Sequence, residues 1–221
     1  MREKRLVIIV EGDCEVLLMN NLLIPYLYGI SRGTSWAINV QKITTNRKLN
    51  RRGGNVSFQY LKNEIGRVAA QGNVLVTTFL DFFRLPVDFP GYTTDGTKID
   101  EVETAIRDTM AMDFFAPYLQ KYEFESLLFS SMDGFNFLLD DPKDLRQIQE
   151  IIDSYDTPED INGGVMTAPS KRLERIFPYN KVTDSTLVLE LLDVDTMRQK
   201  CPRFNRWVKG LIDALLTGRW G

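Results

Sequence analysis

The stretch Leu6-Val7-Ile8-Ile9-Val10 runs directly into Glu11-Gly12-Asp13-Cys14-Glu15, so a short apolar segment ends on an acidic turn. The same arrangement recurs at Val74–Leu80, where seven mostly apolar residues lead into Asp81. Such β-rich runs are typical of buried parallel strands. In an open α/β sheet, ligands bind just beyond the carboxyl ends of the strands. We therefore expect Glu11 and Asp81 to face one crevice.

Acids gathered at one crevice predict a bound cation, because crowded carboxylates repel one another without one. The chain has no histidine and only two cysteines, Cys14 and Cys201. These counts exclude histidine-dependent nucleophilic catalysis, histidine-ligated zinc and a four-cysteine zinc site. Oxygen ligands suit Mg²⁺ or Mn²⁺. The sequence therefore predicts a Mg²⁺ or Mn²⁺ site, with Glu11 and Asp81 as metal ligands and catalytic residues.

Several other acids are candidates for the same site. Glu15 follows Glu11 by one helical turn. Its side chain either reaches the crevice or is stabilised by the positive end of the helix dipole. Asp13 is better explained as a helix cap. Asp88 lies in a proline-rich loop, where it is either a metal ligand or a turn residue. Glu123 follows a fourth apolar segment, and we place it among the catalytic residues.

The order of apolar segments predicts an α/β fold, Toprim-like or Rossmann-like, with a mostly parallel sheet flanked by helices. Strand patterns alternate with helix patterns up to about residue 130, and only helix patterns follow. We divide the chain into an α/β core, residues 1–130, and a helical C-terminal part, residues 131–221, packed on the core. We expect separate helices at 186–192 and 195–217, a strand at 114–120 in which Pro117 indicates an edge position or a bulge, and a helix starting at Tyr122.

Basic residues concentrate in the segment before the acidic half of the core. Seven basic residues fall between Gln41 and Arg67, against one acid, whereas the segment from Asp81 to Asp133 has eleven acids and four bases. A basic flank beside an acidic pocket is the layout expected for holding phosphates around a metal. From the charges alone, a solvated basic loop is the better explanation. The candidate nucleic-acid contacts are Arg47, Lys48, Arg51, Arg52, Lys171 and Arg172.

The motif Val10-Glu11-Gly12-x-x-Glu15, followed by Asp81 at a later strand end, resembles the Toprim domain of topoisomerases, primases and OLD-family nucleases. A closer resemblance is to a bacterial Toprim-related family, domain of unknown function 4276. Its matching segments are Val10–Glu15, Phe79–Gly91, Pro117–Phe129, Ala168–Leu173 and Cys201–Trp207. The resemblance implies metal ligands at Glu11 and Asp81, attack on phosphodiesters, and an ABC-type or OLD-like ATPase partner in phage defence or DNA processing.

The chain departs from this pattern at two positions. Toprim domains usually carry Asp-x-Asp, and here the third position is Phe83. A second metal then depends on Glu15, Asp88 or Glu123. Relatives carry a histidine at the position of Tyr122, which puts the catalytic competence of this chain in question.

Three functions therefore stay open. The first is a Mg²⁺- or Mn²⁺-dependent Toprim-type nuclease acting on nucleic acid, DNA rather than RNA. The second is an inactive adaptor or regulatory subunit of an ABC-type ATPase. The third is another phosphoryl-transfer enzyme on a similar fold. The chain has no long apolar segment and no signal-peptide pattern, so we expect a cytoplasmic protein without a membrane partner, for which an oligomer is compatible.

Overall fold

The computed structural model describes residues 4–46, 51–52, 56–162 and 164–221. The chain forms two compact units, and the first is discontinuous in sequence. The first unit contains the residues up to Leu119 together with Lys209–Gly221, and the second contains Gln120–Val208. A compact unit need not be an independently folding domain, so the domain division after residue 130 stays a prediction.

The first unit is built on a five-stranded sheet with the order β2-β1-β5-β6, and β7 also pairs with β5. β1 lies between β2 and β5 and is parallel to both, and β6 is parallel to β5. This arrangement confirms the predicted α/β fold with a mostly parallel sheet. The strands are β1 (Lys4–Val10), β2 (Trp36–Lys42), β5 (Val74–Asp81), β6 (Phe115–Ala116) and β7 (Leu119–Gln120).

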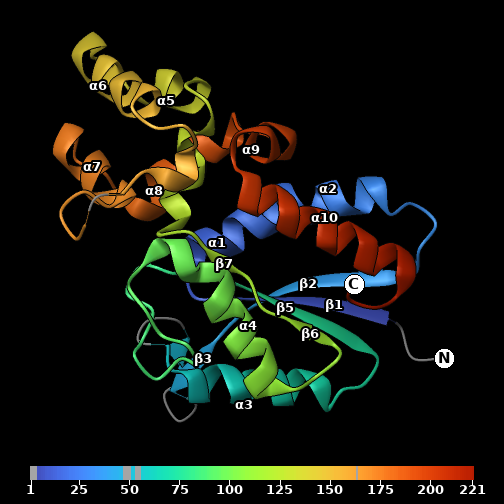
Figure 1. The fold of residues 1–221 in the computed structure, drawn as a ribbon. Helices are drawn as coiled ribbons and strands as arrows, with labels where there is room; N and C mark the ends of the chain where they lie inside the picture. The colour runs from blue at the N-terminus through green and yellow to red at the C-terminus, as the bar shows by residue number, and fades with distance from the viewer. Residues whose placement is uncertain (1–3, 47–50, 53–55, 163) are drawn as a thin grey trace. The chain divides into compact units, whose positions relative to one another are not determined.

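Helices cover both faces of this sheet, which explains why its central strands are apolar throughout (Figure 1). α3 (Phe58–Ala69) and α4 (Ile99–Met110) lie on one face. Their apolar residues pack with Val7, Ile9 and Val76 in one buried cluster. The opposite face carries α1 (Asp13–Leu18), α2 (Ile24–Ile30) and the last part of α10 (Pro202–Thr217).

The chain after β1 forms a nearly continuous helix, as its apolar spacing predicts. A π-helical turn, Met19–Leu23, separates α1 from α2. The final residues of the described chain return to this unit through two tryptophan side chains. The indole of Trp36 donates a hydrogen bond to the carbonyl of Leu215 at 2.8 Å. The indole of Trp220 donates one to the carbonyl of Phe114 at 2.9 Å.

The second unit consists of short helices joined by tight turns. In chain order the α-helices are α5 (Asp133–Leu138), α6 (Pro142–Asp153), α7 (Pro169–Ile176), α8 (Lys181–Glu190), α9 (Val194–Lys200) and the first part of α10. Two 3₁₀ segments, Phe124–Ser130 and Pro158–Asp160, complete the unit. The predicted helical character of the chain after residue 130 is confirmed.

Three predicted elements differ from the structure at residues that break regular geometry. The predicted strand 114–120 is two short strands, because Pro117 has no N–H to continue the ladder. The predicted helix 195–217 is divided at Pro202, which occupies the favoured first position of α10. The expected helix at Tyr122 begins at Phe124 as a 3₁₀ segment, and Tyr122 itself has a left-handed φ of 64°.

The polar segment after β2 contains a short antiparallel pair, β3 (Thr44–Asn46) and β4 (Arg51–Arg52). No helix among residues 4–46, 51–52, 56–162 and 164–221 is both long and apolar enough to cross a membrane. The cytoplasmic location stays a prediction.

Candidate functional site

Glu11 and Asp81 end two neighbouring strands of the first unit. The parallel register pairs Val10 with Phe79, so both acids leave the same edge of the sheet. Adjacent strands run about 4.8 Å apart. Both residues are partly exposed, and both take part in polar interactions. The structure thus brings the two principal sequence candidates to one edge, while their roles as metal ligands stay predictions.

Glu15 adds a third carboxylate close to the end of β1. The side chain is only 3% exposed, although it lies in the first turn of α1. It folds back over Gly12, where an added Cβ would lie 2.6 Å from Oε2. Oε2 accepts no hydrogen bond from the described part of the chain. A buried carboxylate oxygen without a donor costs free energy, so this atom is suited to an additional ligand.

The chain does not use Asp13 as the helix cap that the sequence suggested. Gly12 is the N-cap of α1, and no side chain accepts a capping hydrogen bond there. Asp13 instead forms an ion pair with Lys42 at 2.6 Å, with 66% of its side chain exposed. An ion pair this exposed contributes little to stability.

Asp88, in the loop after β5, contacts the N-terminus of α3. Its carboxylate accepts a hydrogen bond from the backbone N–H of Phe58 at 2.9 Å. A carboxylate at this place is also stabilised by the positive end of the helix dipole. The bond joins residues 30 positions apart, so it is a tertiary contact rather than the turn contact considered from the sequence, and both a turn role and a role as metal ligand stay predictions.

Glu123 belongs to the second unit and contacts the first turn of α7. Its two oxygens accept hydrogen bonds from the backbone N–H of Ser170 at 2.9 Å and from its hydroxyl at 3.1 Å. The side chain is 9% exposed. The N-cap residue of α7, Ala168, offers no side-chain cap, so Glu123 satisfies a free N–H group of this helix N-terminus. A catalytic role for Glu123 stays a prediction.

Glu125 is a buried acid that we did not choose from the sequence. It is 0% exposed, and the ammonium of Lys181 lies 3.0 Å from Oε1. Burial raises the pKa of Glu125 from 4.5 to about 7, against the lowering effect of Lys181, and the nearby Glu123 raises it further. The sequence signal for Glu125 was the Glu-x-Glu pattern. In the structure, Glu123 contacts Ser170 of α7, whereas Glu125 contacts Lys181 of α8.

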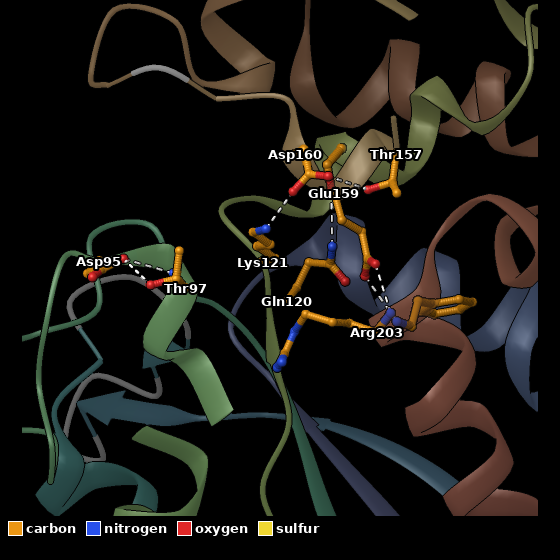
Figure 2. Close-up of polar contacts among 10 residues, drawn as sticks. Asp95, Thr97, Gln120, Lys121, Thr157, Glu159, Asp160 and Arg203 are labelled. Carbon is orange, nitrogen blue, oxygen red and sulfur yellow. Dashed lines mark hydrogen bonds and ion pairs between the residues drawn. The ribbon is translucent and has the colours of Figure 1, made fainter. Parts of the chain in front are cut away.

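Glu159 is a second acid that sequence reasoning missed, and Figure 2 shows it directed at the N-terminus of α10. Its oxygens accept hydrogen bonds from the backbone N–H groups of Arg203 at 2.8 Å and Phe204 at 3.0 Å. Burial raises its pKa, and these two hydrogen bonds oppose the rise. The next residue, Asp160, pairs with Lys121 at 2.5 Å. A cap that lies 44 positions from its helix leaves no local sequence pattern.

Three comparisons with known proteins add to this geometry. A family model described as domain of unknown function, DUF4276, matches residues 10–212. The chain belongs to the DUF4276 family. This result confirms the resemblance that the motifs indicated. A search of curated proteins finds no match to this DUF4276 chain.

Among solved structures, the DUF4276 chain is similar to the C-terminal region of the OLD protein of Xanthomonas campestris pv. campestris. The two share 16% sequence identity with a TM-score of 0.47, over 97% of this chain and 98% of the other.

The predicted phosphate-binding residues of this DUF4276 chain have varied surroundings. Arg47 and Lys48 lie outside the described residues, and Arg51 and Arg52 form β4. Lys171 pairs with Glu174 on the surface of α7.

Arg172 is more deeply engaged than Lys171. It donates hydrogen bonds to the carbonyl of Thr167 at 2.8 Å and to the hydroxyl of Tyr155 at 2.5 Å. Its guanidinium also lies over the Tyr155 ring. These contacts give Arg172 a structural role at the start of α7.

The donor set of this DUF4276 chain suits a hard cation. Within the described ranges, no three Asp, Glu or Cys side chains are placed to hold one metal ion together. Mg²⁺ is commonly held by one or two carboxylates, with water and substrate phosphate completing its octahedron. The partly exposed Glu11 and Asp81, with the unpartnered oxygen of Glu15 nearby in sequence, fit that mode of binding.

Proposed function

We propose that this chain is a Mg²⁺- or Mn²⁺-dependent phosphodiesterase that acts on nucleic acid. The observation that carries the proposal is the buried Oε2 of Glu15, which has no hydrogen-bond donor in the described chain. Glu15 lies one helical turn after Glu11, which follows the end of β1. The neighbouring strand, β5, ends on Asp81. Family membership supports this assignment only through the motifs themselves, because the family description states no activity.

In the proposed reaction, Glu11 and Asp81 would hold the cation through their carboxylate oxygens at the sheet edge. A bound Mg²⁺ or Mn²⁺ polarises the phosphate, lowers the pKa of a bound water and stabilises the leaving oxygen. Alternatively, Glu11 serves as general acid or base rather than as metal ligand, a role compatible with its partly exposed side chain. Glu15 fixes the position of the site from the helix side.

Cleavage assays with matched variants test this proposal. Plasmid DNA, single-stranded DNA and RNA are incubated with Mn²⁺ or Mg²⁺ and with wild type, Asp81→Asn, Glu11→Gln and Asp108→Asn. Asp108 is an exposed acid of α4 and serves as the control. We expect the first two variants to lose activity by about 100-fold or more and the control to match wild type. Equal cleavage by wild type and Asp81→Asn would overturn the proposed site.

A second function, an inactive adaptor for an ABC-type or OLD-like ATPase, is favoured by one observation. Phe83 stands where a Toprim domain usually has its second aspartate, and its ring contacts the guanidinium of Arg84 at 5.2 Å. Under this alternative, wild type cleaves no substrate in either metal. It also binds no Mn²⁺ in isothermal titration calorimetry, whereas the phosphodiesterase binds Mn²⁺ and loses that binding in Glu11→Gln.

A further inference from the structure

A hollow of about 520 Å³ lies beside α3 in the first unit. It is lined by Thr44 and by residues on the outward side of α3, among them Tyr60, Lys62, Gly66 and Arg67. Nothing lies within 4 Å of a Cβ built on Gly66, so the helix surface is open there. The opposite side of α3 is occupied by the apolar core.

The hollow carries positive charge with a defined arrangement. Glu64, buried on α3, accepts hydrogen bonds from the side chain of Gln41, from the backbone N–H of Thr44 at 3.1 Å and from the guanidinium of Arg67. Glu64 therefore fixes Arg67 against the wall of the hollow. Lys62 is exposed and makes no ion pair or side-chain hydrogen bond with the described residues. Among the described residues, Lys62 supplies a positive charge without an ion-pair partner, and Arg67, whose charge Glu64 balances, supplies positioned N–H donors, so the hollow favours an anionic ligand.

Backbone contacts connect this hollow to the strand tips. The N–H of Ile43 donates a hydrogen bond at 3.0 Å to the carbonyl of Val10, the residue before Glu11. The next residue, Thr44, lines the hollow, and its N–H donates to the buried Glu64. The lining of the hollow is therefore one residue away in sequence from a backbone contact with the end of β1.

We propose that this hollow binds the backbone of single-stranded nucleic acid and guides it toward Glu11 and Asp81. Lys62 and Arg67 contact phosphates, and the 39% exposed ring of Tyr60 stacks on a base. Lys62 and Arg67 are five residues apart on α3, about 7.5 Å along its axis and about 140° around it, so they flank the hollow on two sides. The inference rests on the proposed function, because it names the substrate class of that site.

Binding is measured without divalent metal, so that it is independent of cleavage. Fluorescence anisotropy follows a fluorescein-labelled oligothymidine of roughly 12 nucleotides, within the range bound by single-strand proteins, in EDTA. We expect Lys62→Glu to weaken binding about tenfold and to lower the salt dependence. Lys143→Glu, which makes the same charge change on exposed α6, leaves binding unchanged.

A second variant fills the hollow without changing its charge. Gly66→Leu adds a side chain where the helix surface is open, and it also favours helix formation. We expect a higher melting temperature together with at least tenfold weaker binding of the strand. Gly66→Ala, which gains the same helix stability and fills little space, retains most of the binding.

The outcomes separate this inference from the proposed function. The proposal that the hollow binds nucleic acid is overturned if wild type binds no strand in EDTA. It is also overturned if wild type, Lys62→Glu and Gly66→Leu bind equally well. Tighter binding of duplex than of single strand overturns its assignment to a single strand. Binding that depends on Lys62, without cleavage in Mn²⁺, retains the hollow and rejects the phosphodiesterase.

Discussion

The buried acids of the second unit differ from Glu15 of the first unit in what satisfies their oxygens, whereas Glu64 of the first unit, which accepts bonds from Gln41, Thr44 and Arg67, resembles the second-unit acids. In the second unit, Glu123 and Glu159 accept backbone hydrogen bonds from helix N-termini, and Glu125 pairs with Lys181. In the first unit, Glu15 is equally buried, but its Oε2 has no donor in the described chain. Burial alone therefore does not distinguish a structural acid from a functional one. The partners of each oxygen separate the two cases.

The largest effect that would sharpen this comparison is expected at Glu159. Glu159→Ala leaves the N–H groups of Arg203 and Phe204 without their acceptor. Two hydrogen bonds to a charged group are lost, so we expect about 3 kcal/mol less stability in urea unfolding. Glu150→Ala, on the exposed side of α6, is the control and changes stability little. If Glu159→Ala lost no more stability than Glu150→Ala, the structural role of Glu159 would be contradicted.

Glu123 is the acid whose class is in question: its hydrogen bonds are those of a structural acid, whereas the sequence predicts a catalytic one. Glu123→Ala removes both bonds to Ser170, and we expect a loss of about 2 kcal/mol. Glu123→Gln retains an acceptor for one of these bonds and should lose less. If Glu123→Gln keeps wild-type stability but loses cleavage in Mn²⁺, Glu123 belongs with the strand-tip acids and the comparison breaks.

Glu125 predicts a pH dependence of stability. Its pKa rises from 4.5 in the unfolded chain to about 7 in the fold, so the folded state holds the proton more tightly between these values. Stability therefore falls as pH rises from about 4.5 to 7 and changes no further above that range through this group.

Glu125→Gln should remove this dependence and raise stability by about 1 to 2 kcal/mol at pH 8, as measured by urea unfolding across the pH range. Lys181 is 44% exposed, so water hydrates its ammonium when the partner is neutral. An unchanged pH profile in this variant would show that Glu125 does not titrate in the window.

The smallest effect on stability is expected at Glu15. Glu15→Gln replaces an unpartnered buried carboxylate by a neutral amide, so the metal-free protein should keep its stability within about 1 kcal/mol. Wild type should melt at a higher temperature when Mn²⁺ is added, because a ligand of the folded state stabilises it, and Glu15→Gln should lose that increase. Equal stabilisation of both proteins by Mn²⁺ would remove Glu15 from the site.

The sequence predicted best those elements whose cause is local. The strand before Glu11 follows from its apolar run, and the nearly continuous helix after it follows from its apolar spacing. The parallel order of strands also followed, because helical crossovers require it. The breaks at Pro117 and Pro202 were readable from proline chemistry, although we predicted continuous elements there.

The remaining parts of the site depend on contacts between distant residues. The bond of Glu123 to Ser170 spans 47 positions, and that of Glu159 to Arg203 spans 44. No spacing rule relates residues that far apart, so these acids could not be separated from catalytic candidates by pattern. The missing donor at Glu15 likewise becomes visible only when every neighbour is placed.

The insertion of the second unit into the first has a consequence for synthesis on the ribosome. Residues 120–208 are continuous, so the whole second unit emerges before the last segment of the first unit is made. The first unit begins earlier but lacks its last helical segment, and Trp36 must wait 179 residues for the carbonyl of Leu215. Translation adds about 5–20 residues per second. The nascent sheet therefore passes several seconds with one face incompletely covered, a period in which a chaperone would meet exposed apolar strands.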